Sequence, residues 1–240
     1  MWKLSVFMFL ITINFSYSYA KNNSILVGTT GDYPPLTYVV DDTYQGTDIE
    51  IIQKFAKANH ITIKFVPTTW SNLNHDLSSG KFDVAVGGIM DNPSRKKLFY
   101  LSDAIESSTK VPLIKCRDIK RFSSFASIDN EGVIIAENRG GTNQEFALQH
   151  IKFGTIVLYP KNFSSLDSIT ASEFSSDVMF TDNTEAEYRH KINPELCIAP
   201  IREKFPSNNK VFMFAKTSRG YKLVKLFNSW WVKSNDKMVF

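Results

Sequence analysis

The sequence is poor in the residues that build metal centres and disulfide frameworks. Its 240 residues include only two cysteines and four histidines. No CxxC motif is present, and the histidines show none of the short spacings that are typical of zinc ligands. These residues are Cys116, Cys197, His60, His75, His150 and His190. We therefore expect no metal ion, and we expect no cofactor.

Charge of one sign is not concentrated anywhere in the chain. The 28 Lys and Arg residues and the 24 Asp and Glu residues leave a net charge of +4, spread along the sequence rather than gathered in runs. Nucleic-acid-binding domains cluster their basic residues on one face or in one segment. The composition therefore argues against a nucleic-acid partner. With 43% hydrophobic residues, it is typical of a globular protein.

Apolar runs long enough to span a membrane are absent. At the start of the chain, Lys3 is followed by a short apolar run over 4–15 and by the small-x-small sequence Ser18-Tyr19-Ala20. These are the three parts of a secretory signal peptide. We expect residues 1–20 to be removed and the mature protein to begin near Lys21. It should then be soluble, without stable membrane insertion, and periplasmic.

The cysteine count has two interpretations. An even pair in an exported chain favours a disulfide between Cys116 and Cys197. The alternative is two independent buried thiols. We favour the disulfide.

The middle of the chain alternates between short apolar strands and amphipathic helices. Strands are expected over 24–28, 61–66 and 82–86, each followed by a loop rich in Thr, Ser, Asn, Asp or Gly. This alternation predicts an α/β fold with mostly parallel sheets, in which ligands lie at the carboxyl ends of the strands. A second set of strands and helices follows from about Arg117.

Two lobes account for these two sets. We expect residues 21–114 with 205–240 to form lobe 1 and residues 115–204 to form lobe 2. A ligand cleft would then lie between the lobes.

Two carboxylates lie where an expected strand over 177–180 meets a helix that begins near Thr184. Asp182 and Glu185 are three residues apart, so both should lie around the first turn of that helix. They are candidates for acid–base or binding chemistry. The alternative is a well-capped surface helix, in which Thr184 and Glu187 form a capping box.

Other candidate site residues also follow expected strands or turns. Gly140-Gly141-Thr142 precedes a helix, whose N–H groups bind anions, although Thr142 and Glu145 also match a capping box. Arg95 follows a Gly-Gly turn and suits a carboxylate, or else it lies on the surface. Trp70 would line a pocket or pack in the core, and Lys110 would pair with an anion or with Glu185, or be solvated.

Several segments in this order resemble the type II periplasmic amino-acid-binding proteins. They are GTTGDYPPLTY (28–38), GTDIEI (46–51), FDVAVGGI (82–89), Arg95 before FYLSDA, and the Gly-Gly-Thr turn. Other segments are similar to a narrower group with the same fold, the periplasmic cyclohexadienyl dehydratases. They are TTWSNL (68–73), TKVP (109–112), NRGGTNQEFA (138–147) and TDNTEAEYRHKINPELC (181–197).

The narrower resemblance implies a reaction and a set of roles. These enzymes convert prephenate to phenylpyruvate and arogenate to phenylalanine, by losing carbon dioxide and water. The resemblance makes Glu185 the proton donor, with Asn138 and Lys110 as polar catalytic residues. The expected substrate-binding residues are Arg95 and Thr142 for a carboxylate, Asp182 at the position that holds an amino group in the binding proteins, and Trp70, Gly141 and Thr30.

The chain also departs from the binding-protein pattern. Met90 and Asp91 follow the Gly-Gly turn where a hydroxyl residue is usual, and Pro93 is unexpected in that loop. The alternative to a dehydratase is a non-catalytic protein that delivers an amino acid to a membrane transporter. A third interpretation is a member of the family with neither activity.

Overall fold

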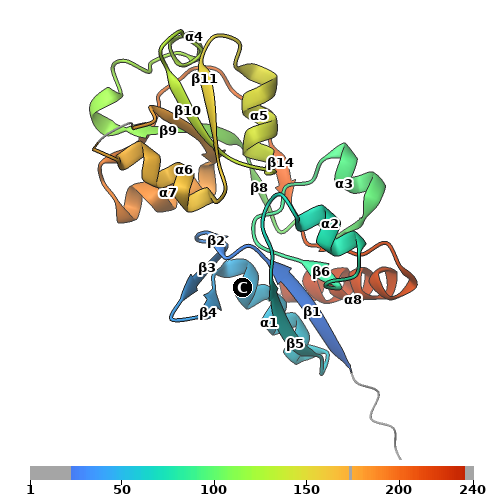
Figure 1. Ribbon diagram of the computed structural model, residues 1–240. Coiled ribbons are helices and arrows are strands. Elements are labelled where there is room, and N and C mark those ends of the chain that lie inside the picture. Colours follow the sequence, from blue (N-terminus) through green and yellow to red (C-terminus); the bar gives the residue numbers. More distant parts are fainter. Residues whose placement is uncertain (1–22, 173–174, 236–240) are drawn as a thin grey trace, which may run out of the picture.

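The computed structural model describes residues 23–172 and 175–235. The expected signal peptide, residues 1–20, lies outside this part of the chain. Figure 1 shows two lobes, each built around a twisted sheet with helices on its faces. The predicted α/β fold with two lobes is confirmed.

The first lobe is built on a five-stranded sheet in the order β5-β1-β6-β15-β7. Strand β1 lies between β5 and β6 and is parallel to both, whereas β15 is antiparallel to both of its neighbours. These strands are β1 (Ser24–Thr29), β5 (Thr62–Pro67), β6 (Val84–Ala85), β7 (Tyr100–Leu101) and β15 (Met213–Phe214). The helices are α1 (Thr47–Ala58), α2 (Leu73–Ser78), α3 (Pro93–Leu98) and α8 (Ser218–Asn235).

Aromatic residues fill the core of this lobe. The ring of Phe227 on α8 packs against Phe55 on α1, with centroids 5.3 Å apart, and against Phe212 at 4.9 Å. Helix α1 presents Ile49, Ile52 and Phe55 to the same core, a spacing that places them on one face. Helix α8 therefore packs on the same lobe as α1.

The second lobe has a five-stranded sheet in the order β11-β10-β12-β9-β13. Strand β10 is parallel to β11 and β12, whereas β9 runs antiparallel between β12 and β13. The strands are β9 (Lys110–Lys115), β10 (Ile134–Asn138), β11 (Thr155–Tyr159), β12 (Val178–Asp182) and β13 (Leu196–Ile198). The helices are the 3-10 turn η1 (Cys116–Asp118), α4 (Phe125–Ile128), α5 (Thr142–His150), α6 (Asn162–Thr170) and α7 (Asn183–Ile192).

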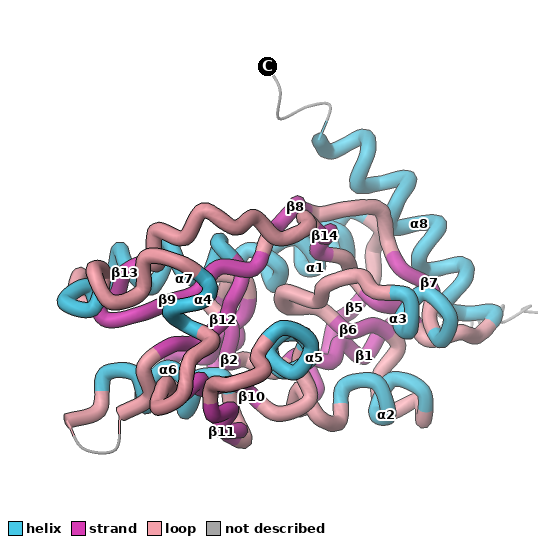
Figure 2. The backbone as a smooth tube through the Cα atoms, turned by 90° about the horizontal axis from the view of Figure 1, so that it is seen from above, coloured by secondary structure: helices cyan, strands magenta, loops and turns pink. Residues whose placement is uncertain are grey.

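A two-stranded ribbon joins the lobes. Strand β8 (Glu106–Ser108) pairs antiparallel with β14 (Asn208–Lys210), and Figure 2 shows the two side by side between the lobes. A three-stranded sheet of β2 (Asp32–Tyr33), β3 (Thr37–Val40) and β4 (Thr43–Gln45) extends lobe 1 toward α6 of the other lobe. The exact lobe boundaries remain a prediction, although β9 places Lys110–Lys115 in the second sheet.

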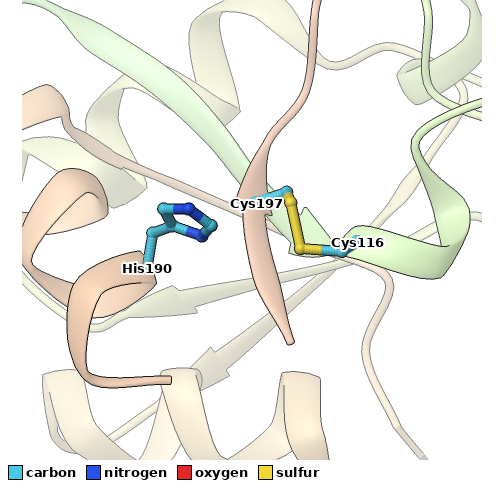
Figure 3. A group of neighbouring side chains, drawn as sticks. All are labelled: Cys116, His190 and Cys197. Carbon is cyan, nitrogen blue, oxygen red and sulfur yellow. A yellow bond between two sulfur atoms is a disulfide. The ribbon is translucent and has the colours of Figure 1, made fainter. Parts of the chain in front are cut away.

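The predicted disulfide is confirmed. Cys116 follows β9, Cys197 lies on the neighbouring strand β13, and their sulfur atoms are joined (Figure 3). The bond closes a loop with a sequence separation of 81 residues, which restricts the unfolded chain.

None of the helices in the described residues is long and apolar enough to cross a membrane.

Candidate functional site

A narrow cavity lies between the lobes, where strands of both sheets end. It is lined by Tyr33, Trp70 and Gly88 from the first lobe and by Asn138, Gly141, Thr142, Asn143 and Asp182 from the second. Its volume is about 10 Å³, which is room for about one water molecule. A substrate the size of an aromatic amino acid would therefore enter only when the lobes separate.

Asp182 is an acid in the lining of the cavity and is bonded to three side chains. It ends β12 and is buried, at 2% exposure. One carboxylate oxygen lies 2.7 Å from Nζ of Lys110, and the other accepts hydrogen bonds from Lys210 and, at 2.5 Å, from the hydroxyl of Tyr33. Burial by itself would raise the pKa of Asp182, but the two ammonium groups outweigh it and hold that pKa well below its usual range. Asp182 is therefore an anion in the closed cleft.

Lys110 connects Asp182 to the beginning of helix α5. It is paired with Asp182 in the antiparallel register of β9 and β12. Its ammonium also donates to the Thr142 hydroxyl at 3.2 Å and to the side-chain oxygen of Asn143. Burial lowers the pKa of Lys110, and the charge of Asp182 opposes that shift. Lys110 does not pair with Glu185, which was one of the expected partners, because its ammonium pairs with Asp182 instead.

Lys210 is a second buried lysine in the cleft, and it is not among the site residues expected from the sequence. It ends β14, has 0% exposure, and donates to Asp182 and to the Gly88 carbonyl at 3.3 Å. Its Nζ also lies 4.8 Å from the centre of the Tyr33 ring. The signal in the sequence was a lysine at the start of an apolar extended run, KVFMFA.

Glu185 lies in the first turn of α7 and is almost fully buried, at 1% exposure. It accepts hydrogen bonds from Thr181 at 2.6 Å, from Asn162 at 2.7 Å and from Arg189 at 2.9 Å. Burial raises the pKa of Glu185, and the Arg189 charge and the hydrogen bonds partly oppose this. Its carboxyl does not line the cavity. It reaches the cavity through the Thr181 hydroxyl, which lies 3.3 Å from the hydroxyl of Tyr33.

Neither of the capping boxes considered as alternatives forms in the structure. The N-cap of α7 is Asp182, and the Thr184 hydroxyl donates instead to Glu106 at 2.9 Å. The N-cap of α5 is Gly141, which has no side chain to cap the helix. The first N–H groups of α5 therefore have no side-chain cap and lie beside the cavity, as an anion site requires.

The Gly-Gly turn before α5 allows two close approaches. Gly140 has φ of 82°, and a Cβ there would lie 2.4 Å from the backbone of Ser71 in the other lobe. A Cβ on Gly141 would lie 2.5 Å from the side-chain nitrogen of Asn138. Asn138 in turn accepts a hydrogen bond from Asn143 at 3.2 Å. The glycines thus let the lobes and the cavity walls meet.

Of three further residues expected to bind the substrate, Trp70 lines the cavity, whereas Thr30 and Arg95 do not. Trp70 lines the cavity and donates from its indole nitrogen to Asp32 at 3.0 Å. Thr30 does not line the cavity, and its buried hydroxyl lies beside Asp32. Arg95 also lies outside the lining. It is buried and donates to the Met90 carbonyl at 2.7 Å, and its Nε has no hydrogen-bond partner among the described residues.

The departures near Arg95 have a structural explanation. Pro93 is the first residue of α3, a position where its missing N–H costs nothing, and Asn92 caps that helix by accepting from the Arg95 N–H at 2.8 Å. Met90 is buried and forms an isolated bridge with Lys210. The loop is thus tied to the ribbon between the lobes.

A comparison with protein families identifies the larger group. The family model for bacterial extracellular solute-binding proteins, family 3, matches residues 25–234. The chain belongs to this family. The expected resemblance to the binding proteins is confirmed.

Individual relatives of this family-3 protein include both an enzyme and binding proteins. It is 32% identical to a cyclohexadienyl dehydratase of Pseudomonas aeruginosa over 82% of this chain and 73% of the relative. It is 30% identical to an L-cystine-binding protein of Bacillus subtilis over 51% of this chain and 49% of the relative. The crystal structure of an ancestral amino acid-binding protein, described as a precursor of cyclohexadienyl dehydratase, superimposes with a TM-score of 0.82 and 25% identity, covering 90% of this chain and 91% of the other.

Within the described residues of the family-3 protein, one group of side chains has the composition of a metal site. Cys116, Cys197 and His190 place their ligand atoms within 4.8 Å of one another (Figure 3). The two sulfur atoms, however, are joined in the disulfide, and a metal requires the thiolate form. The ring Nδ1 of His190 lies 2.6 Å from the Leu196 carbonyl. The arrangement is structural while the disulfide is intact.

Proposed function

We propose that this family-3 protein is an exported, periplasmic cyclohexadienyl dehydratase. It would convert prephenate to phenylpyruvate, arogenate to phenylalanine, or both. The similarity to the Pseudomonas aeruginosa enzyme along most of the chain supports the proposal. The family description as extracellular supports the expected export.

The reaction requires a proton and sites for carboxylates. The bond between the ring and its carboxylate breaks and releases carbon dioxide, and the electron pair moves through the ring. The ring carbon–oxygen bond then breaks, and the hydroxyl leaves as water after it takes up one proton. Aromatisation provides the driving force, so the protein must supply the acid and hold the anion.

The buried carboxyl of Glu185 is the observation that carries the proposal. A carboxyl whose pKa is raised by burial retains its proton closer to neutral pH, as a general acid needs. When Glu185 is protonated, its O–H donates to Thr181, Thr181 donates to Tyr33, and Tyr33 donates to Asp182. In this series of hydrogen bonds, the hydroxyls of Thr181 and Tyr33 each accept one hydrogen bond and donate one. The proton would be passed to the leaving hydroxyl from Tyr33, which lines the cavity.

The opposite wall of the cavity suits the carboxylates of the substrate. Thr142 and Asn143 lie at the uncapped beginning of α5, and Asn138 lies beside them at the end of β10. Lys110 contacts two of these residues, and its ammonium would bind a carboxylate there. Arg95 has one buried N–H group with no partner in the described part of the chain, and its positive charge acts on Glu145 of α5 and on Asp182.

A second candidate function is the binding of an amino acid for a membrane transporter. The similarity to the L-cystine-binding protein and the fold shared with the ancestral amino acid-binding protein favour it. A receptor needs no general acid, so the role of Glu185 separates the two functions.

The experiment is a comparison of two glutamates on the same helix. Glu185→Gln keeps the shape of the side chain but removes the proton, and we expect kcat with prephenate to fall at least about 100-fold. Glu187 lies two residues further along the same helix and is exposed, and Glu187→Gln should leave kcat unchanged. If Glu185→Gln folds and keeps full turnover, Glu185 is not the acid. If the wild type makes no product and binds an amino acid, the receptor function is correct.

A further inference from the structure

The acceptor groups on one side of the cavity form a site for an ammonium ion. The Asp182 carboxylate, the Gly88 carbonyl and the face of the Tyr33 ring point to one place, and all three residues line the cavity. An anionic oxygen, a carbonyl oxygen and an aromatic face are the groups that bind ammonium in proteins. The α-ammonium of an amino acid would fit these contacts.

The ammonium of Lys210 already occupies this place. It contacts the Asp182 carboxylate, lies 3.3 Å from the Gly88 oxygen, and lies 4.8 Å from the Tyr33 ring centre. Lys210 has 0% exposure, so its ammonium is bound by protein groups and not by solvent.

The backbone of Lys210 is held on two sides. It pairs with Glu106 in the ribbon between the lobes, and its carbonyl accepts from the Ile105 N–H at 2.8 Å. On the other side it bridges to Met90, and the preceding residue, Asn209, donates to Asp91 at 3.0 Å. The backbone of this lysine is therefore anchored at the junction of the lobes, and its ammonium reaches Asp182 in the closed cleft.

The charges in the cleft make a further ammonium unfavourable. Among the described residues, Asp182 is the one carboxylate that lines the cavity, and it is shared by Lys110 and Lys210. A ligand ammonium would be a third cation on the same acid, and it would also have to displace Lys210. Bringing like charges together in a desolvated site costs free energy, and proteins use this cost to reject unwanted ligands. A ligand with a carbonyl oxygen at that position would instead accept a hydrogen bond from Lys210.

We infer that Lys210 is a specificity-determining residue that fills the ammonium site and restricts the cleft to 2-oxo acids, excluding α-amino acids. This inference builds on the proposed function and gives it a substrate: prephenate, which carries the oxo group, rather than arogenate, which carries the ammonium.

The first test compares the two substrates in wild type and in Lys210→Ser. We expect wild type to have the higher kcat/KM with prephenate. In Lys210→Ser, Asp182 is released and space is opened, so the prephenate-to-arogenate ratio of kcat/KM should fall at least about 10-fold. Lys210→Met removes the charge and keeps most of the volume. It should shift the ratio in the same direction by less, and it carries the test if Lys210→Ser does not fold. A preference of the wild type for arogenate, or an unchanged ratio in the folded variants, would overturn the inference.

The second test does not depend on catalysis. Phenylpyruvate and L-phenylalanine share one skeleton and differ in the oxo and ammonium groups, and calorimetry measures the binding of each. Wild type should bind phenylpyruvate at least about 10-fold more tightly, and Lys210→Ser should lose that preference. Equal, absent or reversed preference in wild type would overturn the role of Lys210. A protein that shows the expected preference but turns over neither prephenate nor arogenate would refute the dehydratase function alone.

Discussion

The ammonium of Lys110 and the carboxylate of Asp182 lie 2.7 Å apart, from directly paired positions of the antiparallel strands β9 and β12. Both side chains are at least nine-tenths buried, and Lys210 binds the other oxygen of the same acid. The strand pairing brings opposite charges together before any ligand arrives. The cleft is thus organised around one anion and two cations.

Removing the charge of Asp182 should destabilise the protein. Asp182→Asn leaves two buried lysines without their anion, and we expect the free energy of unfolding at pH 7 to fall by about 3–5 kcal/mol. The matched control is Glu50→Gln, which breaks the exposed Lys54–Glu50 pair and should cost less than about 1 kcal/mol. Urea denaturation measures both. Equal decreases in the free energy of unfolding for the two variants would show that the buried charge cluster does not stabilise the protein.

The same cluster predicts a direction of pH dependence. The folded-state pKa of Asp182 lies below its unfolded value of 3.8, so the unfolded state binds more protons between the two values. The stabilisation from Asp182 is complete above pH 3.8 and decreases as the pH falls further. Wild type should therefore lose more stability than Asp182→Asn between pH 5 and pH 3, measured by thermal unfolding. Parallel curves for the two proteins would contradict this.

The kcat for prephenate should decrease at high pH because Glu185 loses its proton. A general acid acts only while protonated, and the pKa of Glu185 is raised above 4.5 by burial. We expect kcat for prephenate to fall as the pH rises through that raised pKa. The residual rate of Glu185→Gln should show no such fall, since glutamine does not titrate. An identical alkaline limb in both proteins would assign it to another group.

The Thr181 hydroxyl is the link between Glu185 and the cavity. Thr181→Val has nearly the same shape but cannot pass on a proton, and we expect kcat with prephenate to fall about 10-fold or more while KM changes little. Thr181→Ser keeps the hydroxyl and should restore most of the rate. Full turnover by a folded Thr181→Val would exclude a path through this side chain.

Reduction of the disulfide should lower stability. The bond between Cys116 and Cys197 closes a long loop, so reductant should lower the free energy of unfolding by about 3–5 kcal/mol. The double variant Cys116→Ser with Cys197→Ser should be less stable and insensitive to reductant. A mass shift on alkylation that requires prior reduction would confirm the bond in the purified protein.

The parts of the cleft that follow single strands were predictable from the sequence. Asn138 ends β10, Asp182 ends β12, and Trp70 lies in the loop after β5. The ends of parallel strands gather at one edge of a sheet, so local patterns were enough to place Asn138 and Asp182 at one edge of the second sheet and Trp70 at the corresponding edge of the first. The same reasoning predicted the two α/β lobes, because it depends on alternating elements and not on contacts between them.

The parts that depend on contacts between distant segments were not predictable in this way. Lys210 reaches the cleft only because β14 pairs with β8 and crosses between the lobes. The capping box at Thr184 and Glu187 failed because Glu106, on the other strand of that ribbon, takes the Thr184 hydroxyl. Both errors have the same origin, which is tertiary contact at the junction of the lobes.

The most direct test of the proposed function is an assay of the purified mature protein with prephenate at neutral pH. Phenylpyruvate is followed by its absorbance, and the rate is compared with that of prephenate alone. We predict phenylpyruvate formation in proportion to protein concentration. No formation above the uncatalysed rate, from a folded protein that binds an amino acid, would contradict the dehydratase function and identify a transport receptor.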